Sequence, residues 1–256
     1  MFAIERLNKI KEKLFKEKRV DVFELSELFS VTEVTIRRDL DKLEQEGFLI
    51  KTYGGAVLNE ELVLEPSKSE IEYSNIEEKK MIGKIASQMI ENNEAIYLSP
   101  GTTCLEIARN IKDKKLTVVT NDIMIAQELR DSVGIKVIVT GGDLIQSTST
   151  LVGGFALQAL GGIYINKAFI GIKGANFDSG YTIDSHEEVM VIQGVKKISS
   201  EIVIVADYTK FGCTAFARLG DLTMVRKVIT NKQVPAEFKK YYFENSIKLY
   251  TTFEFE

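Results

Sequence analysis

The sequence predicts two domains, a small helical domain with a β-wing over residues 1–57 and an α/β domain with a parallel sheet over residues 75–256. Three observations carry this prediction. Apolar residues recur at helical spacing in the first part, and near-continuous apolar strands alternate with helical stretches in the second. Between them lies a polar stretch, residues 58–74, which contains Pro66 and which we interpret as a linker.

The composition is that of a globular protein without a membrane segment. Apolar residues make up 45% and charged residues 27% of the 256 residues. There is no run of about 18 apolar residues, and the charged N-terminus lacks the apolar segment of a signal peptide. Cys104 and Cys213 are too far apart in sequence to suggest a disulfide framework. We therefore expect a reduced cytoplasmic protein that makes no membrane contact.

The charge distribution excludes a uniformly basic nucleic-acid binder. The first 57 residues hold 11 basic and 11 acidic side chains, so the net charge of −4 belongs to the rest of the chain. Any contact with DNA must therefore come from the placement of a few charges rather than from bulk attraction.

The first domain begins with two predicted helices. Ile10 and Leu14 recur at helical spacing in the first of them. Asp21 then precedes an apolar stretch, and Glu24 follows three residues later, which is a capping-box pattern for the second helix. A short break separates this helix from a third.

The third helix is expected to start after an N-cap at Thr32 and to run to about Glu46. Gly47 ends it. Beyond it, the run FLIKTYGGAV has strand-like residues on both sides of a Gly54-Gly55 turn, as a β-wing would. This layout predicts a winged helix-turn-helix.

The third helix turns its arginines away from the core. At about 100° per residue, its apolar side chains share one narrow sector, opposite Arg38. These apolar residues are Ile36, Leu40 and Leu43. A helix-turn-helix reads DNA from the start of its second helix, where Thr32 stands. We predict that Arg38 and Thr35 contact base edges, while Arg37 and the wing residue Lys51 contact phosphate.

An exposed helix with ordinary surface charges would explain the same residues. Asp39 or Asp41 could pair with the two arginines and neutralise them. The three-helix layout, the short turn and the following wing favour the DNA-binding interpretation.

The second domain alternates strand-like and helical stretches. The strand-like runs are EAIYLS, LTVVT, IKVIVT, KAFIGI, EIVIVA and KVIT. The helical stretches lie around 103–111, 122–130, 151–160, 187–199 and 236–245. A further helix through Ile90 is expected to open with a capping box of Asn75 and Glu78.

Polar loops follow the strands of this domain. Gly101, Thr102 and Thr103 lead from the first strand into a helix, where backbone N–H groups and two hydroxyls can bind phosphate or carboxylate. The next two strands are followed by other polar or flexible residues. These are Asn121, Gly141 and Gly142.

The stretch ADYTKFG follows the fifth strand-like run. Lys210 can contact a phosphate as a point charge, and Asp207 can accept hydrogen bonds from sugar hydroxyls. Each of these features alone also fits a plain turn or a solvated side chain. Their shared position at the ends of strands in one sheet predicts a common effector pocket.

His186, Glu187 and Glu188 form a polar cluster that could supply acid–base chemistry. The acids fit better as the start of the helix that follows, where the helix dipole favours them. We keep Glu187 as an effector contact and predict no catalytic residue. Cys104, His186 and Cys213 lack the spacing of metal ligands, so we predict no metal and no cofactor.

Two motifs of the first domain carry a family resemblance. VTEVTIRRDLDKL together with YGGA resembles the N-terminal signature of the deoxyribose-regulator (DeoR) family of bacterial transcription factors. This chain has Thr32 where members usually have Ser, a mild exchange because both residues can cap a helix. It has Tyr53 where members often have His.

The stretches PGTT, TND, TGG, LVGG and ADYTKFG resemble the family's C-terminal sensor domain. That domain is related in fold to ribose-phosphate isomerases and CoA transferases, and the resemblance implies that it binds a phosphorylated sugar or related metabolite and alters DNA binding. Members commonly have an aspartate before the GTT loop, where this chain has Ser99-Pro100. The resemblance carries over Thr102, Thr103, Asp207 and Lys210.

These features together predict a transcription regulator, a repressor of a sugar-metabolism operon controlled by a phosphorylated sugar. One small neutral domain makes few DNA contacts, so we expect a homo-oligomer, a dimer or tetramer, that reads repeated half-sites of operator DNA. The alternative is a sugar-phosphate isomerase-like enzyme with an accessory DNA-binding domain.

Overall fold

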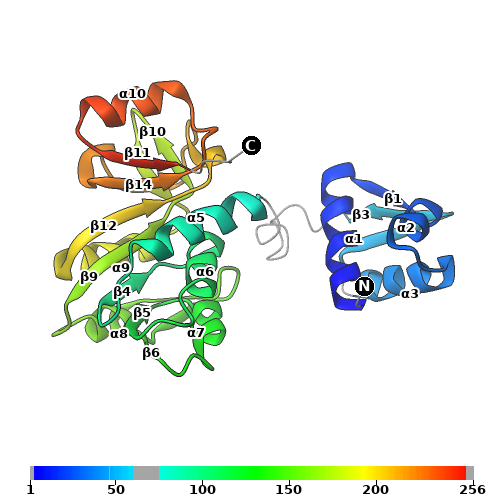
Figure 1. Cartoon of the computed structure of the whole chain (residues 1–256), viewed down its shortest axis with the longest axis horizontal. Coiled ribbons are helices and arrows are strands. Elements are labelled where there is room, and N and C mark those ends of the chain that lie inside the picture. Colours follow the sequence, from blue (N-terminus) through cyan, green and yellow to red (C-terminus); the bar gives the residue numbers. More distant parts are fainter. Residues whose placement is uncertain (1–2, 46, 60–74, 252–256) are drawn as a thin grey trace. The chain divides into compact units, whose positions relative to one another are not determined.

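A computed structural model describes residues 3–45, 47–59 and 75–251. The chain divides into two compact units, residues 1–74 and 75–256. Most of the predicted linker, residues 60–74, lies outside the described residues, as does Glu46, the expected end of the third helix. The two units are described separately below, with their elements labelled in Figure 1.

The N-terminal unit contains three helices and a small antiparallel sheet. Its elements are α1 (Ala3–Glu17), β1 (Arg19–Asp21), α2 (Val22–Phe29), α3 (Glu33–Gln45), β2 (Leu49–Thr52) and β3 (Gly55–Leu58). The sheet order is β1-β3-β2, so the hairpin predicted as the wing is present and gains a third strand, β1, that the sequence did not predict. The winged helix-turn-helix is confirmed.

Local capping explains where these helices begin. The Asp21 carboxylate accepts hydrogen bonds from the backbone N–H groups of Phe23 and Glu24, at 2.8 and 3.2 Å, as predicted for the start of α2. Gly47 follows α3 with a φ of 76°, which glycine adopts without steric cost. The apolar residues of the three helices and the wing form one buried cluster, which includes Ile36, Leu40 and Leu43.

The C-terminal unit is built on a seven-stranded parallel sheet with the order β15-β14-β12-β9-β4-β5-β6. These strands are β4 (Ala95–Leu98), β5 (Leu116–Thr120), β6 (Ile135–Val139), β9 (Ile165–Gly171), β12 (Ser199–Val205), β14 (Lys227–Thr230) and β15 (Lys248–Thr251). The six predicted strand-like runs all form strands of this sheet, and only β15 was missed. Apolar clusters on both faces bury the sheet, as the continuous apolar runs predicted.

Helices cover this sheet (Figure 1). They are α5 (Ile76–Gln88), α6 (Thr102–Arg109), α7 (Ile123–Leu129), α8 (Gly154–Ala159), α9 (His186–Ile198) and α10 (Ala236–Glu244), with short 3₁₀ turns η2 (Tyr208–Lys210) and η3 (Leu222–Met224). No helix among the described residues is both long and apolar enough to cross a membrane.

Two small antiparallel sheets of this unit were not predicted. One has the order β10-β11-β13, from β10 (Gly174–Asn176), β11 (Gly180–Ile183) and β13 (Ala217–Gly220), and the other pairs β7 (Asp143–Ile145) with β8 (Thr150–Val152). The predicted helix at 151–160 was therefore wrong at its start, because its first residues belong to β8.

The capping box expected at the start of α5 was also wrong. Asn75 has a φ of 52°, and its side chain makes no capping hydrogen bond to the helix. Its amide Nδ2 instead donates to the Thr209 hydroxyl at 3.4 Å. The start of α5 is thereby tied to the loop that follows β12.

Candidate functional site

The start of α3 holds the predicted DNA-contacting residues. The Thr35 N–H donates to Thr32 Oγ1 at 3.4 Å, and the two hydroxyls lie 3.0 Å apart. Thr32 is therefore the N-cap that the sequence predicted. Because the Thr35 hydroxyl is engaged in this cap and the residue is half-buried, its predicted contact with a base edge requires that pairing to open.

The two arginines of α3 are both exposed but differ in their partners. Arg37 lies 3.3 Å from Glu33, one turn earlier on the same helix. In the described part of the chain, no ion pair joins Arg38 to another residue. Asp39 is buried and pairs with Arg6 instead. Arg38 is thus the arginine of this helix that is best placed to reach a base.

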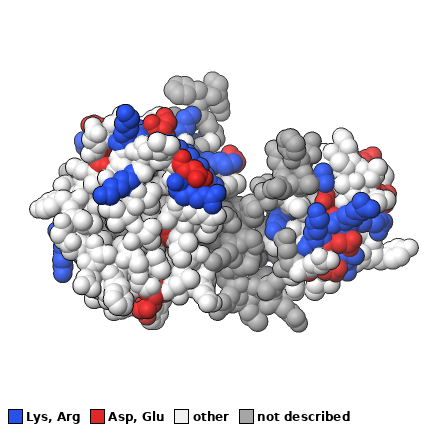
Figure 2. All heavy atoms as spheres, turned by 90° about the horizontal axis from the view of Figure 1, so that it is seen from below, with Lys and Arg blue, Asp and Glu red and all other residues white. Residues whose placement is uncertain are grey.

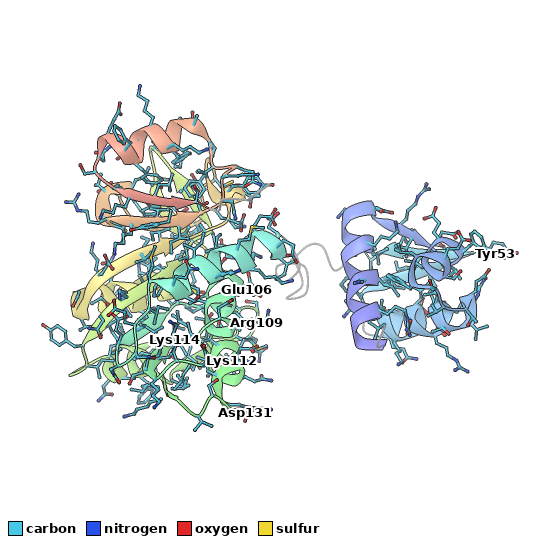
Figure 3. All side chains as sticks on the ribbon, in the orientation of Figure 1. Tyr53, Glu106, Arg109, Lys112, Lys114 and Asp131 are labelled. Carbon is cyan, nitrogen blue, oxygen red and sulfur yellow. The ribbon has the colours of Figure 1, made fainter. Side chains whose placement is uncertain are left out.

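The wing contributes Lys51 and Tyr53. The Lys51 ammonium lies 2.5 Å from Asp41 and 3.7 Å from Glu44, and the hydrogen bond that it donates to Asp41 raises the pKa of Lys51. It would have to exchange these partners to contact phosphate. Tyr53 lies at the turn between β2 and β3, fully exposed (Figure 3).

Basic and acidic side chains are mixed on the N-terminal unit. On the face in Figure 2, its basic side chains lie next to acidic ones. Residues 1–57 hold 11 basic and 11 acidic side chains, so this part of the chain carries no net charge.

In the C-terminal unit, the GTT loop lies at the end of β4. Gly101 has a φ of 119°, and its N–H donates to the Asp122 carboxylate at 3.0 Å. Thr102 and Thr103 are half-buried and form the first turn of α6, where backbone N–H groups have no partner within the helix. Of this loop, these two residues can still offer donors to an anion.

The residues that depart from the family pattern have a structural role. Ser99 is 1% exposed, and its hydroxyl accepts a hydrogen bond from the Gly171 N–H at 2.8 Å. It also lies 3.6 Å from the buried Cys104 sulfur. Ser99 thus joins the ends of β4 and β9.

Asn121 is buried at the end of β5, and both ends of its amide are engaged. Oδ1 accepts from the Tyr97 hydroxyl at 2.5 Å, and Nδ2 donates to the Leu151 carbonyl at 2.8 Å. Burial raises the pKa of Tyr97, which keeps this phenol a donor. Asn121 holds β8 against the sheet, and its predicted contact with an effector would break two buried hydrogen bonds.

The two glycines after β6 behave differently. A Cβ on Gly142 would lie 2.2 Å from the Val152 carbonyl oxygen, so glycine is required there for the backbones to approach. Gly141 has a φ of 70° and no atom within 4 Å of such a Cβ. Of this predicted pair, only Gly141 borders open space.

Asp207 and Lys210 flank the short turn after β12. Asp207 is 1% exposed, and its Oδ1 accepts from the backbone and the hydroxyl of Thr209. Its other oxygen, Oδ2, is buried and has no hydrogen-bond partner in the described part of the chain. Lys210 is half-buried in the same turn.

Lys79, a lysine on α5 that is only 3% exposed, was not predicted as a site residue. Burial lowers the pKa of Lys79 to about 8, Asp207 opposes this shift, and Lys210 and Lys173 add to it. Lys79 therefore lies close enough to Asp207, Lys210 and Lys173 for their charges to act on it. The sequence pattern could have predicted the burial of Lys79, because Lys79 lies on the same face of the helix as the buried Ile82.

The packing of α5 on α6 brings Lys79 near the middle of α6. A Cβ on Gly83 would lie 2.7 Å from the backbone of Glu106, which Figure 3 shows on α6. Lys79 lies one turn before Gly83 on α5, and the Glu106 carboxylate opposes the lowering of the Lys79 pKa by burial.

Acidic groups lie near Lys173. Burial raises the pKa of Glu188 to about 7, Lys173 opposes the shift, and Asp184 and Asp122 increase it. Glu187, the predicted effector contact, is exposed and accepts a hydrogen bond from the Ser185 hydroxyl at 2.9 Å. Glu188, which was not predicted, is the more buried of the two acids.

Two further expectations concern chemistry. His186 is exposed in the first turn of α9, where Ser185 caps the helix, as expected for a polar helix start. Among residues 3–45, 47–59 and 75–251, no three His, Cys, Asp or Glu side chains form a group that could hold a metal ion.

Both units match family models. Residues 6–62 match the DeoR-like helix-turn-helix domain, and residues 74–232 match the DeoR C-terminal sensor domain. The HTH-type transcriptional regulator YulB of Bacillus subtilis is 35% identical over 240 residues, which cover 93% of each chain. The transcriptional repressor GlcR of the same organism is 30% identical, covering 98% of this chain and 97% of its own.

More distant similarities follow. The glycerol-3-phosphate regulon repressor of Escherichia coli is 27% identical over 97% of this chain and 99% of its own. Among solved structures, ribose 5-phosphate isomerase A from Methanocaldococcus jannaschii is 14% identical, with a TM-score of 0.41 over 54% of this chain and 55% of that chain.

Proposed function

The chain belongs to the DeoR family of DNA-binding transcriptional regulators, and we propose that it represses a sugar-metabolism operon under the control of a phosphorylated sugar. Two of its relatives are named as repressors, one of them of a glycerol-3-phosphate regulon. The proposal assigns operator binding to α3 and effector binding to the carboxyl ends of the parallel strands.

The observation that supports the effector assignment is the buried position of Lys79. Burial, Lys210 and Lys173 lower the pKa of Lys79, whereas Asp207 and Glu106 raise it. Lys173 itself pairs with Asp184 at 3.2 Å. A phosphate beside Lys79 and Lys210 would add a further negative charge and favour the charged form of Lys79.

The start of α6 supports the same position for the phosphate. Thr102 and Thr103 can add two backbone N–H groups and two hydroxyls, and their helix α6 packs against α5, which carries Lys79. Gly101 is less suitable because its N–H is already bound to Asp122. We assign the phosphate to Lys79, Lys210 and the two threonines.

The acidic residues suit the sugar part of the ligand. Asp207 Oδ2 is buried without a described partner, so it can accept a hydroxyl proton. Glu188 can accept or donate near neutral pH because its pKa is about 7. A molecule with a phosphate at one end and hydroxyls at the other complements both groups.

The start of α5 supports a route from the effector to DNA binding. Asn75 bonds to Thr209, and the Asn231 amide donates to the Glu78 carbonyl at 3.2 Å. A ligand that contacts the 207–210 turn can therefore shift the start of α5. These are the first described residues after the segment that leads from the DNA-binding unit. We infer that the effector changes the spacing of paired DNA-binding units in a homo-oligomer.

We propose binding without turnover, since the relatives are regulators and a repressor needs only two states of different DNA affinity. The isomerase-like alternative predicts conversion of the bound sugar phosphate between aldose and ketose. Incubation with the stabilising ligand, followed by product analysis, separates these functions.

Thermal unfolding of the full chain with a panel of three- to six-carbon sugar phosphates, each beside its free sugar, tests the effector assignment. A ligand at a hundredfold excess over its Kd should stabilise the sensor by about 2.7 kcal/mol. Lys79→Met and Lys210→Ala should abolish the shift. Lys84→Ala, an exposed lysine on the same helix, should keep it. No shift with any sugar phosphate would overturn the effector assignment.

A further inference from the structure

Val34 is an exposed apolar residue in the first turn of α3, with 61% of its surface accessible. A single exposed valine is ordinary on a protein surface. Its position is not, because Arg38 follows four residues later and therefore projects from the same face of the helix. Both residues lie on the face that points away from the Ile36, Leu40 and Leu43 core.

The other polar groups at the start of this helix already have partners. The Thr35 hydroxyl lies 3.0 Å from that of Thr32, and Arg37 pairs with Glu33. In the first two turns of α3, the exposed side chains of this face without a described partner are thus the apolar Val34 and the cationic Arg38. Each of these side chains complements a different base edge.

A valine in the major groove favours thymine over the other bases. Thymine alone presents a methyl group there, whereas cytosine and adenine present an amino donor and guanine presents acceptors. Packing a valine over those polar groups would desolvate them without a hydrogen bond, which is unfavourable. Packing it on the thymine methyl buries apolar surface on both sides.

We propose that Val34 is a specificity-determining residue that packs against the C5-methyl group of a thymine, close to a guanine contacted by Arg38. The two side chains are one helical turn apart, about 5.4 Å along the axis. Base pairs stack about 3.4 Å apart, so the thymine lies within about two base pairs of the guanine. This inference rests on the insertion of α3 into the major groove.

The experiment starts from DNA selected by the full-length protein from a randomised duplex library. The guanine read by Arg38 is identified as the position where Arg38→Ala loses base preference. Each thymine within two base pairs of it is then replaced by uracil, which lacks only the methyl group. For the wild type, one such replacement should weaken binding about fourfold, the equivalent of about 0.8 kcal/mol for one buried methyl group.

Val34→Ala should bind the thymine and uracil duplexes equally. Alanine has the higher helix propensity, so α3 is retained in this variant. Leu28→Ala removes an exposed aliphatic side chain of α2 and should keep the fourfold difference.

Two results would overturn the role of Val34. One is a selected sequence with no preferred thymine in that window, and the other is an equal uracil effect in the wild type and in Val34→Ala. If α3 is not the helix that enters the major groove, the result is different. Arg38→Ala should then leave base preference unchanged at every position.

Discussion

The Asp39 carboxylate pairs with Arg6 of α1, with 2.6 Å between Arg6 Nε and Asp39 Oδ2, rather than with the adjacent Arg38. Both side chains are buried: Arg6 is 7% exposed and Asp39 is 3% exposed. The pair ties α1 to α3 beneath the reading face. Because Asp39 pairs with Arg6 inside the domain, it does not neutralise the exposed Arg38, which can then contact DNA.

Breaking this buried pair should destabilise the N-terminal unit strongly. Asp39→Ala leaves the Arg6 charge buried without its partner, and such losses cost about 3–5 kcal/mol. Urea denaturation followed by circular dichroism measures the change. Asp41→Ala, which removes a surface acid beside Lys51, should cost less than about 1 kcal/mol. Equal effects of the two variants would show that Arg6 and Asp39 are not coupled.

Arg38→Ala should relax base preference more than it weakens overall DNA binding. A bidentate contact from arginine to guanine discriminates by about 1–3 kcal/mol. Arg37→Ala should instead weaken all sequences alike and reduce the salt dependence of binding, because a phosphate contact releases counterions. Titrations at several salt concentrations, with selected and scrambled duplexes, distinguish the two. If Arg37→Ala relaxed base preference and Arg38→Ala weakened all sequences alike, Arg37 would be the base contact and Arg38 the phosphate contact.

Gly83→Ala should loosen the contact between α5 and α6. The new Cβ would lie 2.7 Å from the Glu106 backbone, so the helices must separate. We expect a loss of about 1–3 kcal/mol in stability, and weaker effector binding because α5, which carries Lys79, is displaced from α6. Gly154→Ala on α8, where a Cβ meets no atom within 4 Å, is the control and should be near neutral. A neutral Gly83→Ala variant would contradict the packing account.

Glu188 should make stability fall as the pH rises from about 4.5 to 7. Its pKa is about 7 when folded, against 4.5 for the free side chain, so the folded protein binds more protons within this window. Above pH 7 the buried carboxylate costs on the order of 2–3 kcal/mol. Glu188→Gln should remove that slope and be the more stable protein above pH 7, measured by denaturation at several pH values. The exposed Glu187→Gln is the control, and a slope unchanged in Glu188→Gln would contradict the burial of this acid.

The parallel sheet could be predicted from the sequence because each strand carries its own signal. Runs such as LTVVT and KVIT are apolar, β-branched and bounded by polar residues, and both form strands with the predicted bounds. β1 could not be found in this way. It has three residues, of which only Val20 is buried, and it exists because it pairs with β3 more than thirty positions later.

The pocket was predictable as a region but not residue by residue. The strand ends identified Asp207 and Lys210, which both act on the charge of Lys79, and Thr102 at the start of α6. Lys79 was missed because its burial depends on contact between α5 and a turn more than a hundred residues away. Asn121 follows a strand in the same way as the predicted ligand contacts do. Its amide is hydrogen-bonded to Tyr97 and to the Leu151 carbonyl, and these long-range contacts could not be predicted from the sequence.

The most direct test of this account measures the affinity of the full-length protein for its selected operator with and without the stabilising sugar phosphate. The account predicts that the ligand changes the Kd by about five- to 150-fold in the wild type, the usual range of allosteric coupling. In Lys79→Met the same ligand concentration should leave the Kd unchanged. A sugar phosphate that binds the sensor but leaves the wild-type Kd for DNA unchanged would contradict the proposed control of repression.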